Sequence, residues 1–264
     1  MATLRASNPA GERAGCQRRG APFRLGTYTR QMLATLLFFT LGIVGSPAFW
    51  LLHKLAGRRI PVRTGQKMVR GLFRIYISGM KALGMLRLET QGLEALQDLR
   101  GTVIVSNHPA LLDAFFLLAN LPPAACVMRA DLLRNPVMCG SALLAGYVTN
   151  DSGPGFVRQG IEKICSGGNL LIFPEGTRTI DPPVNRFKHG FAMVATRSQA
   201  AVQTVLIEYQ GTHLSKGVSL FSPTAAPLHF ILRAGERFLP FPGEAPPAFS
   251  RRIESWFREE LSNR

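Results

Sequence analysis

The sequence predicts an α/β fold in which a mostly parallel sheet is flanked by helices, with a separate helical segment at the N-terminus. Short β-rich runs alternate with helical stretches after residue 85, which is typical of a parallel sheet covered on both faces. An uncharged, largely apolar run occupies residues 31–52, and most of the positive charge lies before residue 89. The last two observations set the N-terminal third apart from the rest of the chain.

The net charge of +15 is spread unevenly over the 264 residues. Residues 1–88 contain 15 of the 31 Lys and Arg residues and one acidic residue, Glu12, whereas residues 89–264 contain 16 basic and 15 acidic residues. A basic surface suits nucleic acid or an anionic membrane. Because the basic residues interleave with long apolar runs, we expect an anionic membrane surface as a partner and no nucleic acid.

The run at residues 31–52 is long enough to cross a bilayer, for which a helix needs about 20 apolar residues. Gly42, Gly45, Ser46 and Pro47 interrupt it, so a kinked or re-entrant helix fits as well as a clean span. Basic residues flank both ends, which favours a hairpin or a monotopic insertion with both ends in the cytoplasm. We expect an N-terminal helical membrane-binding segment on the cytoplasmic face of the cell inner membrane.

A second stretch, Lys67–Leu86, mixes basic and apolar residues. It reads as an amphipathic helix in the headgroup zone. The alternative is a packed surface helix with a solvated basic face. Together these patterns predict a basic, disordered N-terminus over 1–30, a membrane-associated helical segment over 31–85 and the α/β domain over 86–264.

The elements of the α/β domain follow from apolar runs and turn signals. Strands are expected at 86–91, 102–106, 124–129, 169–173, 202–209 and 228–233. Helices are expected at 111–121, 131–144, 156–165 and 187–197, and a last amphipathic helix follows Ser250. Asp131 is the expected N-cap of the second of these helices, although Pro136 lies inside it, and Ser250 is the expected N-cap of the last.

The first candidate site lies at the end of the strand at 102–106. His108 follows this strand, and Asp113 stands five residues later at the start of a helix. A turn between them brings the carboxylate to one imidazole nitrogen and leaves the other nitrogen free as a base. No Ser or Cys is placed beside this pair as a nucleophile, so a substrate group has to attack. A His that caps the helix and a surface Asp remain the alternative.

The second candidate site follows the strand at 169–173. Gly176 permits close backbone approach, and Arg178 offers a planar fork that suits a phosphate. Glu175 is expected to orient that arginine or to accept a substrate hydroxyl, and Lys188 adds a cation near a helix start. A Pro-Gly turn with a surface ion pair is the alternative.

No metal site is expected. The four cysteines, Cys16, Cys126, Cys139 and Cys165, have no metal-ligand spacing, and no histidine pairs at i, i+4 with another His or Cys. The cysteines are typical of reduced thiols in a cytosolic domain.

Taken together, the two sites resemble the glycerolipid acyltransferase family. Its N-H-x4-D block stands here as Asn107, His108 and Asp113, its F-P-E-G-T-R block as residues 173–178, and its F-K-x-G element as residues 187–190. The resemblance covers roughly residues 85–235 and implies a glycerol-3-phosphate acyltransferase-like fold. It also agrees with a membrane-binding helical segment at the N-terminus.

The resemblance implies transfer of a fatty acyl group from acyl-CoA or acyl carrier protein to a hydroxyl of a lyso-glycerolipid such as 1-acylglycerol-3-phosphate. His108 would be the general base and Asp113 would hold its imidazole. The implied substrate-binding residues are Asn107, Glu175, Gly176, Thr177, Arg178 and Lys188. No cofactor is implied beyond the donor, which is a substrate, and acyl carrier protein is a possible protein partner.

Two departures from the family pattern concern acceptor recognition. Ser152 falls near the position of an arginine in the family's second block, and residues 201–205 lack the prolines of its fourth block. These departures suggest another acceptor, such as a different lyso-phospholipid, an ornithine-type lipid or a specialised pigment lipid. A hydrolase that activates water at His108, or a catalytically degenerate membrane-binding protein, are the remaining alternatives.

Overall fold

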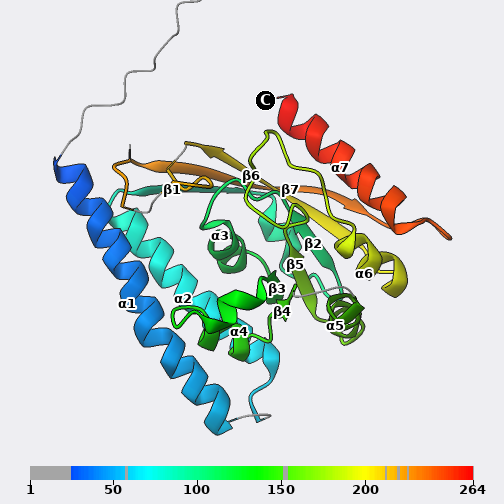
Figure 1. Cartoon of the computed structure of the whole chain (residues 1–264), viewed down its shortest axis with the longest axis horizontal. Coiled ribbons are helices and arrows are strands. Elements are labelled where there is room, and N and C mark those ends of the chain that lie inside the picture. The colour runs from blue at the N-terminus through cyan, green and yellow to red at the C-terminus, as the bar shows by residue number, and fades with distance from the viewer. Residues whose placement is uncertain are drawn as a thin grey trace, which may run out of the picture.

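The computed structural model describes residues 25–56, 59–150, 154–211, 213–218, 221–224 and 226–263. They form a seven-stranded sheet with helices on both faces (Figure 1). The strands are β1 (Leu86–Gln91), β2 (Val103–Ser106), β3 (Ala124–Met128), β4 (Val148–Thr149), β5 (Asn169–Ile172), β6 (Val202–Gln210) and β7 (Leu228–Phe238). The helices are α1 (Leu25–Ala56), α2 (Val62–Ala82), α3 (Asp113–Asn120), α4 (Cys139–Leu144), α5 (Pro154–Cys165), α6 (Gly190–Ser198) and α7 (Pro246–Ser262).

The order of the strands across the sheet is β1-β7-β6-β2-β5-β3-β4. Neighbouring strands are parallel except for β6 and β7, which are antiparallel. The predicted α/β class with a mostly parallel sheet is therefore confirmed. Strand β2 lies between β5 and β6, so the carboxyl ends of β2 and β5 meet at one edge of the sheet.

The helices form two layers, one on each face of the sheet. Side chains of α1, α2 and α3 share a core with one face of the strands, and those of α5, α6 and α7 share a core with the other. Figure 1 shows α1 and α2 side by side on one side of the molecule and α7 on the far side of the sheet. The sheet is buried on both faces, as expected for parallel strands.

Helix α1 is one continuous helix of 32 residues with Pro47 inside it. The small residues that we expected to interrupt it are its contact residues instead. Gly42 faces Val137, and Ser46 Oγ accepts a hydrogen bond of 2.9 Å from the backbone N–H of Gly140. A Cβ at Gly140 would collide with the Ser46 carbonyl, so the close approach of α1 and α4 requires this glycine. The helix also starts at Leu25, inside the segment that we expected to be disordered; residues 1–24 lie outside the described residues.

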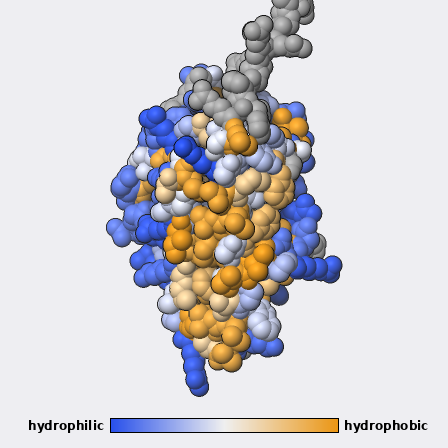
Figure 2. Space-filling model, turned by 90° about the vertical axis from the view of Figure 1, so that its left-hand side faces the viewer, coloured by the Kyte–Doolittle hydropathy of each residue, from blue (hydrophilic) through white to orange (hydrophobic). Residues whose placement is uncertain are grey.

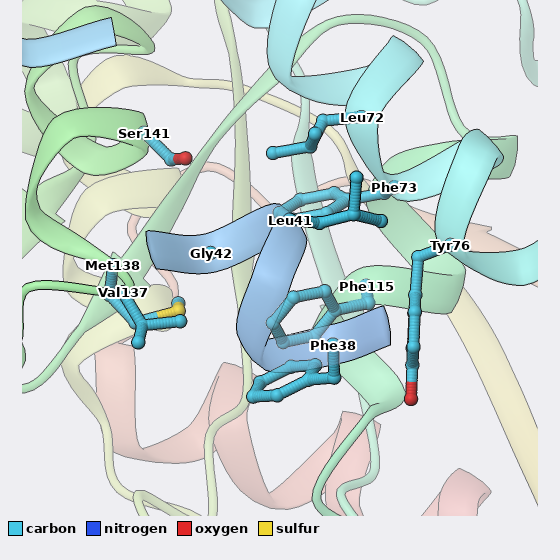
Figure 3. Close-up of a pocket in the computed structure, with 10 residues that line it drawn as sticks. All are labelled: Phe38, Leu41, Gly42, Leu72, Phe73, Tyr76, Phe115, Val137, Met138 and Ser141. Atoms are coloured by element: carbon cyan, nitrogen blue, oxygen red, sulfur yellow. The ribbon is translucent and has the colours of Figure 1, made fainter. Parts of the chain in front are cut away.

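Aromatic side chains fill the seam between α1, α2 and α3 (Figure 3). The ring centroid of Phe38 lies 5.6 Å from that of Tyr76 and 5.6 Å from that of Phe115. The space left among these rings is about 20 Å³, which holds one water molecule at most. We interpret this seam as the packing surface that attaches α1 to the domain.

Helix α2 corrects the expectation that its apolar face lies in lipid. That face is buried in the protein through Val69, Phe73, Ile77 and other residues. On the polar side, the Nε atoms of Arg70 and Arg74 each donate to the carbonyl of Ala119 near the end of α3. The alternative of a packed surface helix is therefore the one that the structure supports.

Two further element predictions were wrong. No continuous helix covers residues 131–144: a 3₁₀ turn, Ala130–Arg134, is followed by α4, because Pro136 cannot continue a helix begun before it. Asp131 lies inside that turn instead of capping a helix. The last helix begins at Pro246, so Ser250 lies inside it and is fully buried.

The outer face of α1 is the main apolar surface on the side of the molecule where α1 and α2 lie. Figure 2 shows a hydrophobic band along this side, bordered by hydrophilic residues on both edges. The exposed large apolar side chains of α1 are Leu25, Leu33, Leu36, Ile43, Val44, Trp50, Leu51 and Leu55. Among the described residues, α1 is the one helix that is long and apolar enough to cross a membrane.

Candidate active site

Two loops at the carboxyl ends of β2 and β5 form the candidate site. In the first loop, the His108 Nδ1 atom lies 2.8 Å from the Asp113 Oδ2 atom. The same carboxylate oxygen accepts a hydrogen bond of 2.7 Å from the backbone N–H of Ala110, so the turn between the two residues is closed on itself. The predicted pairing of His108 with Asp113 is therefore present in the structure.

The imidazole of His108 is held on a second side by an aromatic ring. The Phe173 ring is stacked against it, with 4.3 Å between the ring centroids and 25° between the planes. The His108 side chain is 20% exposed. No described residue makes a hydrogen bond to Nε2, so this atom is available to a ligand.

Asp113 is completely buried at the start of α3. Burial raises the pKa of its carboxyl above the ordinary value, and the hydrogen bond from His108 opposes this change. No described residue bonds the Oδ1 atom, although Arg178 lies close enough to favour the charged form. A buried carboxylate against one imidazole nitrogen stabilises an imidazolium and fixes the tautomer in which Nε2 is the base.

Glu175 has a different position from the one that we expected. Its Oε1 atom accepts hydrogen bonds of 2.9 Å from the His108 backbone N–H and from the Thr179 hydroxyl, and its Oε2 atom accepts one of 2.9 Å from the Asn185 backbone N–H. The side chain is 3% exposed, and burial raises its pKa. The Thr179 backbone N–H also donates to the His108 carbonyl at 2.7 Å. We therefore interpret Glu175 as a brace that joins the two loops.

Asn107 likewise supports the backbone. Its side-chain amide donates to the Ile207 carbonyl at 2.8 Å and accepts from the Ile207 N–H at 2.8 Å. This pair of bonds continues the pairing of β2 and β6 past the last residue of β2. The amide that the family resemblance assigns to substrate binding is thus engaged within the protein.

The cationic residues of the second loop lie at its surface. Arg178 Nη1 donates to the carbonyls of Leu214 at 3.0 Å and Ser215 at 2.9 Å, and no described residue bonds its Nε or Nη2. Gly176 has φ +69°, and a Cβ there would approach Lys188 Nζ to 2.7 Å. The positive φ favours glycine in this turn, and the end of the flexible Lys188 side chain occupies the space beside it. Thr177 is half-buried in the same turn.

A cavity of about 380 Å³ lies beside these loops, between β3, β5, α5 and α6. Its wall is largely apolar, and it includes Phe173, whose other contact is the His108 ring. Lys188 and Arg197 supply positive charge to its lining. This volume is within the usual range for a small-molecule site.

Some of the site was not predicted from the sequence. The role of Phe173 was missed, although an aromatic residue at a strand end beside a histidine loop is a usable signal. The carbonyls that hold Arg178 could not be predicted, because backbone atoms of a distant loop leave no residue pattern. Ser152, on which the acceptor hypothesis depends, lies outside the described residues.

The chain is similar to known acyltransferases. Residues 87–208 match the family model described as Acyltransferase. A 1-acyl-sn-glycerol-3-phosphate acyltransferase of Pseudomonas aeruginosa is 28% identical over 177 residues, which are 64% of this chain and 68% of that relative. An enzyme with the same description from Limnanthes alba is 28% identical over 148 residues, and the match spans about half its length, 51%.

A lyso-ornithine lipid O-acyltransferase of Pseudomonas aeruginosa is 34% identical over 118 residues, 40% of this chain and 42% of the relative. Among solved structures, the 1-acyl-sn-glycerophosphate acyltransferase PlsC of Thermotoga maritima superposes with a TM-score of 0.71 at 22% identity, over 90% of this chain and 97% of that one. This last similarity establishes the fold. With the match of residues 87–208 and the sequence relatives, the comparisons support an O-acyltransferase of the lysophospholipid type in the glycerolipid acyltransferase family.

Proposed function

We propose that this protein transfers a fatty acyl group from an acyl thioester to the hydroxyl of a membrane lyso-lipid, with 1-acylglycerol-3-phosphate as the first candidate acceptor. One observation carries the proposal: His108 Nδ1 is hydrogen-bonded to the buried Asp113, and no described residue makes a hydrogen bond to His108 Nε2. The nearest hydroxyl in sequence, that of Ser106, is fully buried and donates to the Asn107 carbonyl. The nucleophile is therefore the acceptor itself.

The reaction follows from this arrangement. As the acceptor hydroxyl attacks the thioester carbonyl, His108 Nε2 takes its proton, and Asp113 stabilises the imidazolium. The tetrahedral intermediate collapses with cleavage of the C–S bond. The leaving thiolate takes the proton from the imidazolium, and the products are the acyl ester and a free thiol. The brace from Glu175 and the ring of Phe173 keep the imidazole in place during both proton transfers.

The donor is proposed to be acyl-CoA or acyl carrier protein, with no further cofactor and no metal. The cavity beside Phe173 suits such a ligand, because an apolar wall accepts an alkyl chain or pantetheine arm and the charges of Lys188 and Arg197 suit its phosphate. Both donors present the same thioester to His108.

The acceptor is proposed to bind with its anionic headgroup at Arg178. The atoms Nε and Nη2 of this residue are not bonded by any described residue, and a guanidinium suits a phosphate. A lyso-ornithine lipid is the second candidate acceptor. The 34% identity to an enzyme with that description favours it, as does Ser152 near the position of an arginine in the family's second block.

We further propose that the protein is held on the cytoplasmic face of the inner membrane by α1. Residues from Gln31 to Ser46 of this helix contact the domain on one side, while Leu36, Ile43 and Val44 are more than half exposed on the other. A helix that packs side-on against a domain presents a lengthwise apolar face, which suits insertion into one leaflet. The excess of Lys and Arg before residue 89 adds attraction to anionic lipid.

The test is acyl transfer by the purified full chain in mixed micelles. Labelled acyl-CoA and acylated carrier protein are offered with a panel of acceptors: 1-acylglycerol-3-phosphate, lyso-phospholipids with other headgroups and lyso-ornithine lipid. Transfer to one acceptor that His108→Ala abolishes supports the proposal and identifies the acceptor. Thioester consumption without an acylated product would show a hydrolase, and no turnover with any donor would favour a membrane-binding role alone.

A further inference from the structure

The segment between β6 and β7, His213–Val218, contacts three parts of the protein at once. The Leu214 carbonyl accepts hydrogen bonds of 3.0 Å from the backbone N–H of Leu111 and from Arg178 Nη1. Leu111 lies between His108 and Asp113 in the chain, so one carbonyl touches both candidate loops. The Ser215 carbonyl accepts a second bond of 2.9 Å from Arg178 Nη1.

Helix α1 is attached to the same region through Gln31. This residue is 3% exposed, although it begins a long apolar run. Its Nε2 atom donates to the Ser222 carbonyl at 2.7 Å, and its Oε1 atom accepts from the Thr224 backbone N–H at 3.2 Å. Nε2 also lies 3.4 Å from Nε2 of His213, which is buried. Burial lowers the pKa of His213, so its neutral ring can accept this bond.

These bonds make Gln31 a fixed point for the segment that holds Arg178. A buried side-chain amide that is bonded on both of its polar atoms is costly to displace, because each orphaned group would be left without water. The bonds to Ser222 and Thr224 therefore fix the part of the β6–β7 connection that lies nearer to β7. His213 directly precedes Leu214 and Ser215, whose carbonyls accept hydrogen bonds from Arg178 Nη1. Because Nη1 donates to both carbonyls, the plane of the guanidinium is fixed, and the edge that carries Nε and Nη2 has one orientation.

We infer that Gln31 is a positioning residue for Arg178, acting through the His213–Ser215 backbone, so that the seating of α1 sets the affinity of the site for the anionic headgroup of the acceptor. This inference rests on the proposed function, in which Arg178 binds that headgroup. Because α1 is also the proposed membrane helix, the residue that recognises the lipid is held by the element that inserts into lipid.

The test is steady-state kinetics of the full chain in detergent micelles, with acyl-CoA and 1-acylglycerol-3-phosphate as substrates. Gln31→Met keeps the length of the side chain and its helix preference but removes the contact with His213 and the bonds to Ser222 and Thr224. We expect the acceptor KM to rise about tenfold, the effect of one or two lost buried hydrogen bonds, while the donor KM and kcat stay within about twofold of wild type. Thr29→Val on the same helix is the matched control, because Thr29 is exposed and bonds to its own helix at Leu25; it should change nothing.

A double-mutant cycle with Arg178→Ala shows whether Gln31 acts through the arginine. If it does, Gln31→Met raises the acceptor KM no further in the Arg178→Ala background. Additive effects overturn the inference, as does an unchanged acceptor KM in a folded Gln31→Met variant. A parallel change of kcat and both KM values with a lowered thermal midpoint also overturns it, since that is the result of a purely structural role.

Two further measurements keep the inference testable. If Gln31→Met does not fold, His213→Leu replaces it, because it removes the ring nitrogen that lies 3.4 Å from Gln31 Nε2 on the proposed route to Arg178, and the same criteria apply. If Arg178→Ala itself leaves the acceptor KM unchanged, the proposed acceptor site fails together with this inference. If Arg178→Ala raises that KM and Gln31→Met does not, this inference alone fails.

Discussion

The brace at Glu175 makes a sharp prediction, because a residue that contacts substrate and one that holds the backbone respond differently to Glu175→Gln. The carboxylate accepts three hydrogen bonds on two oxygens, from His108, Thr179 and Asn185. Glutamine has one oxygen. In either orientation its NH₂ group therefore faces at least one backbone N–H inside a site that is 3% exposed.

The loss of unfolding free energy caused by Glu175→Gln can be worked out from these contacts. Each buried donor left without a partner costs about 1–3 kcal/mol. Removal of the charge offsets part of this, because burial raises the pKa of Glu175 and the charged form is therefore desolvated at a cost. We expect a net loss of about 2 kcal/mol of unfolding free energy, or about 4–8 °C in the thermal midpoint for a chain of this size. Since either orientation breaks the link through Glu175 between His108 and Asn185, the loop of His108 is loosened and kcat should fall about tenfold or more.

The assay pairs thermal unfolding of the full chain in detergent with acyl-transfer kinetics. Thr179→Val is the matched control, since it removes one bond to the same carboxylate and leaves the charge; it should cost about 1 kcal/mol and change kcat little. A Glu175→Gln variant with the wild-type thermal midpoint but a raised acceptor KM would refute the brace and return Glu175 to the substrate site.

Three other predictions address the base, its buried partner and the membrane helix. His108→Ala should lower acyl transfer by about 10²–10⁴-fold while vesicle flotation is unchanged; retention of most activity would exclude His108 as the base. Burial raises the folded pKa of Asp113, so the folded state holds that proton more tightly and wild-type stability falls as pH rises from the ordinary value of 3.8 through the folded pKa. In urea titrations at a series of pH values, the stability of Asp113→Asn relative to wild type should rise across that window, with kcat lowered; a constant difference would contradict the desolvation argument. Val44→Lys should reduce flotation with anionic vesicles about 100-fold, whereas Val44→Leu should not, and equal flotation of the two would show that this face does not enter lipid.

Local patterns in the sequence were sufficient for six of the seven strands, but not for β4 or for the order of the strands in the sheet. The apolar runs at 102–106 and 169–173 correspond to β2 and β5, which are adjacent and parallel. Since residues after neighbouring parallel strands meet at one edge, the approach of residues 107–113 to residues 174–179 follows once β2 and β5 are adjacent, and the structure supplies that adjacency. The bonds of His108 to Glu175 and Thr179 are the direct expression of that approach.

Long-range contacts explain what could not be predicted. Asn107 bonds to Ile207, and Ser46 to Gly140, and neither partner can be found from the spacing of residues along the chain. A glycine in an apolar run predicts a break in a helix if the helix is isolated and a close contact if another helix approaches. At Gly42 another segment approaches the helix, so the glycine forms a close contact. Pro136 instead breaks the predicted helix at 131–144, a local effect that could have been predicted from its position in the sequence.

The two sides of α1 give the helix two separate tasks. Small and polar residues, Gln31, Gly42 and Ser46, lie on the side that contacts the domain, and large apolar residues such as Ile43 and Val44 lie on the exposed side. Both sides lack charge over residues 31–52, so composition alone marks this part of the helix as a span and conceals its docked side. A helix tied at Gln31 to the connection between β6 and β7 and at Ser46 to α4 cannot leave the domain without breaking buried hydrogen bonds. In the proposed arrangement the membrane therefore meets the domain and α1 together, and the proposed acceptor site has a fixed position relative to the lipid surface.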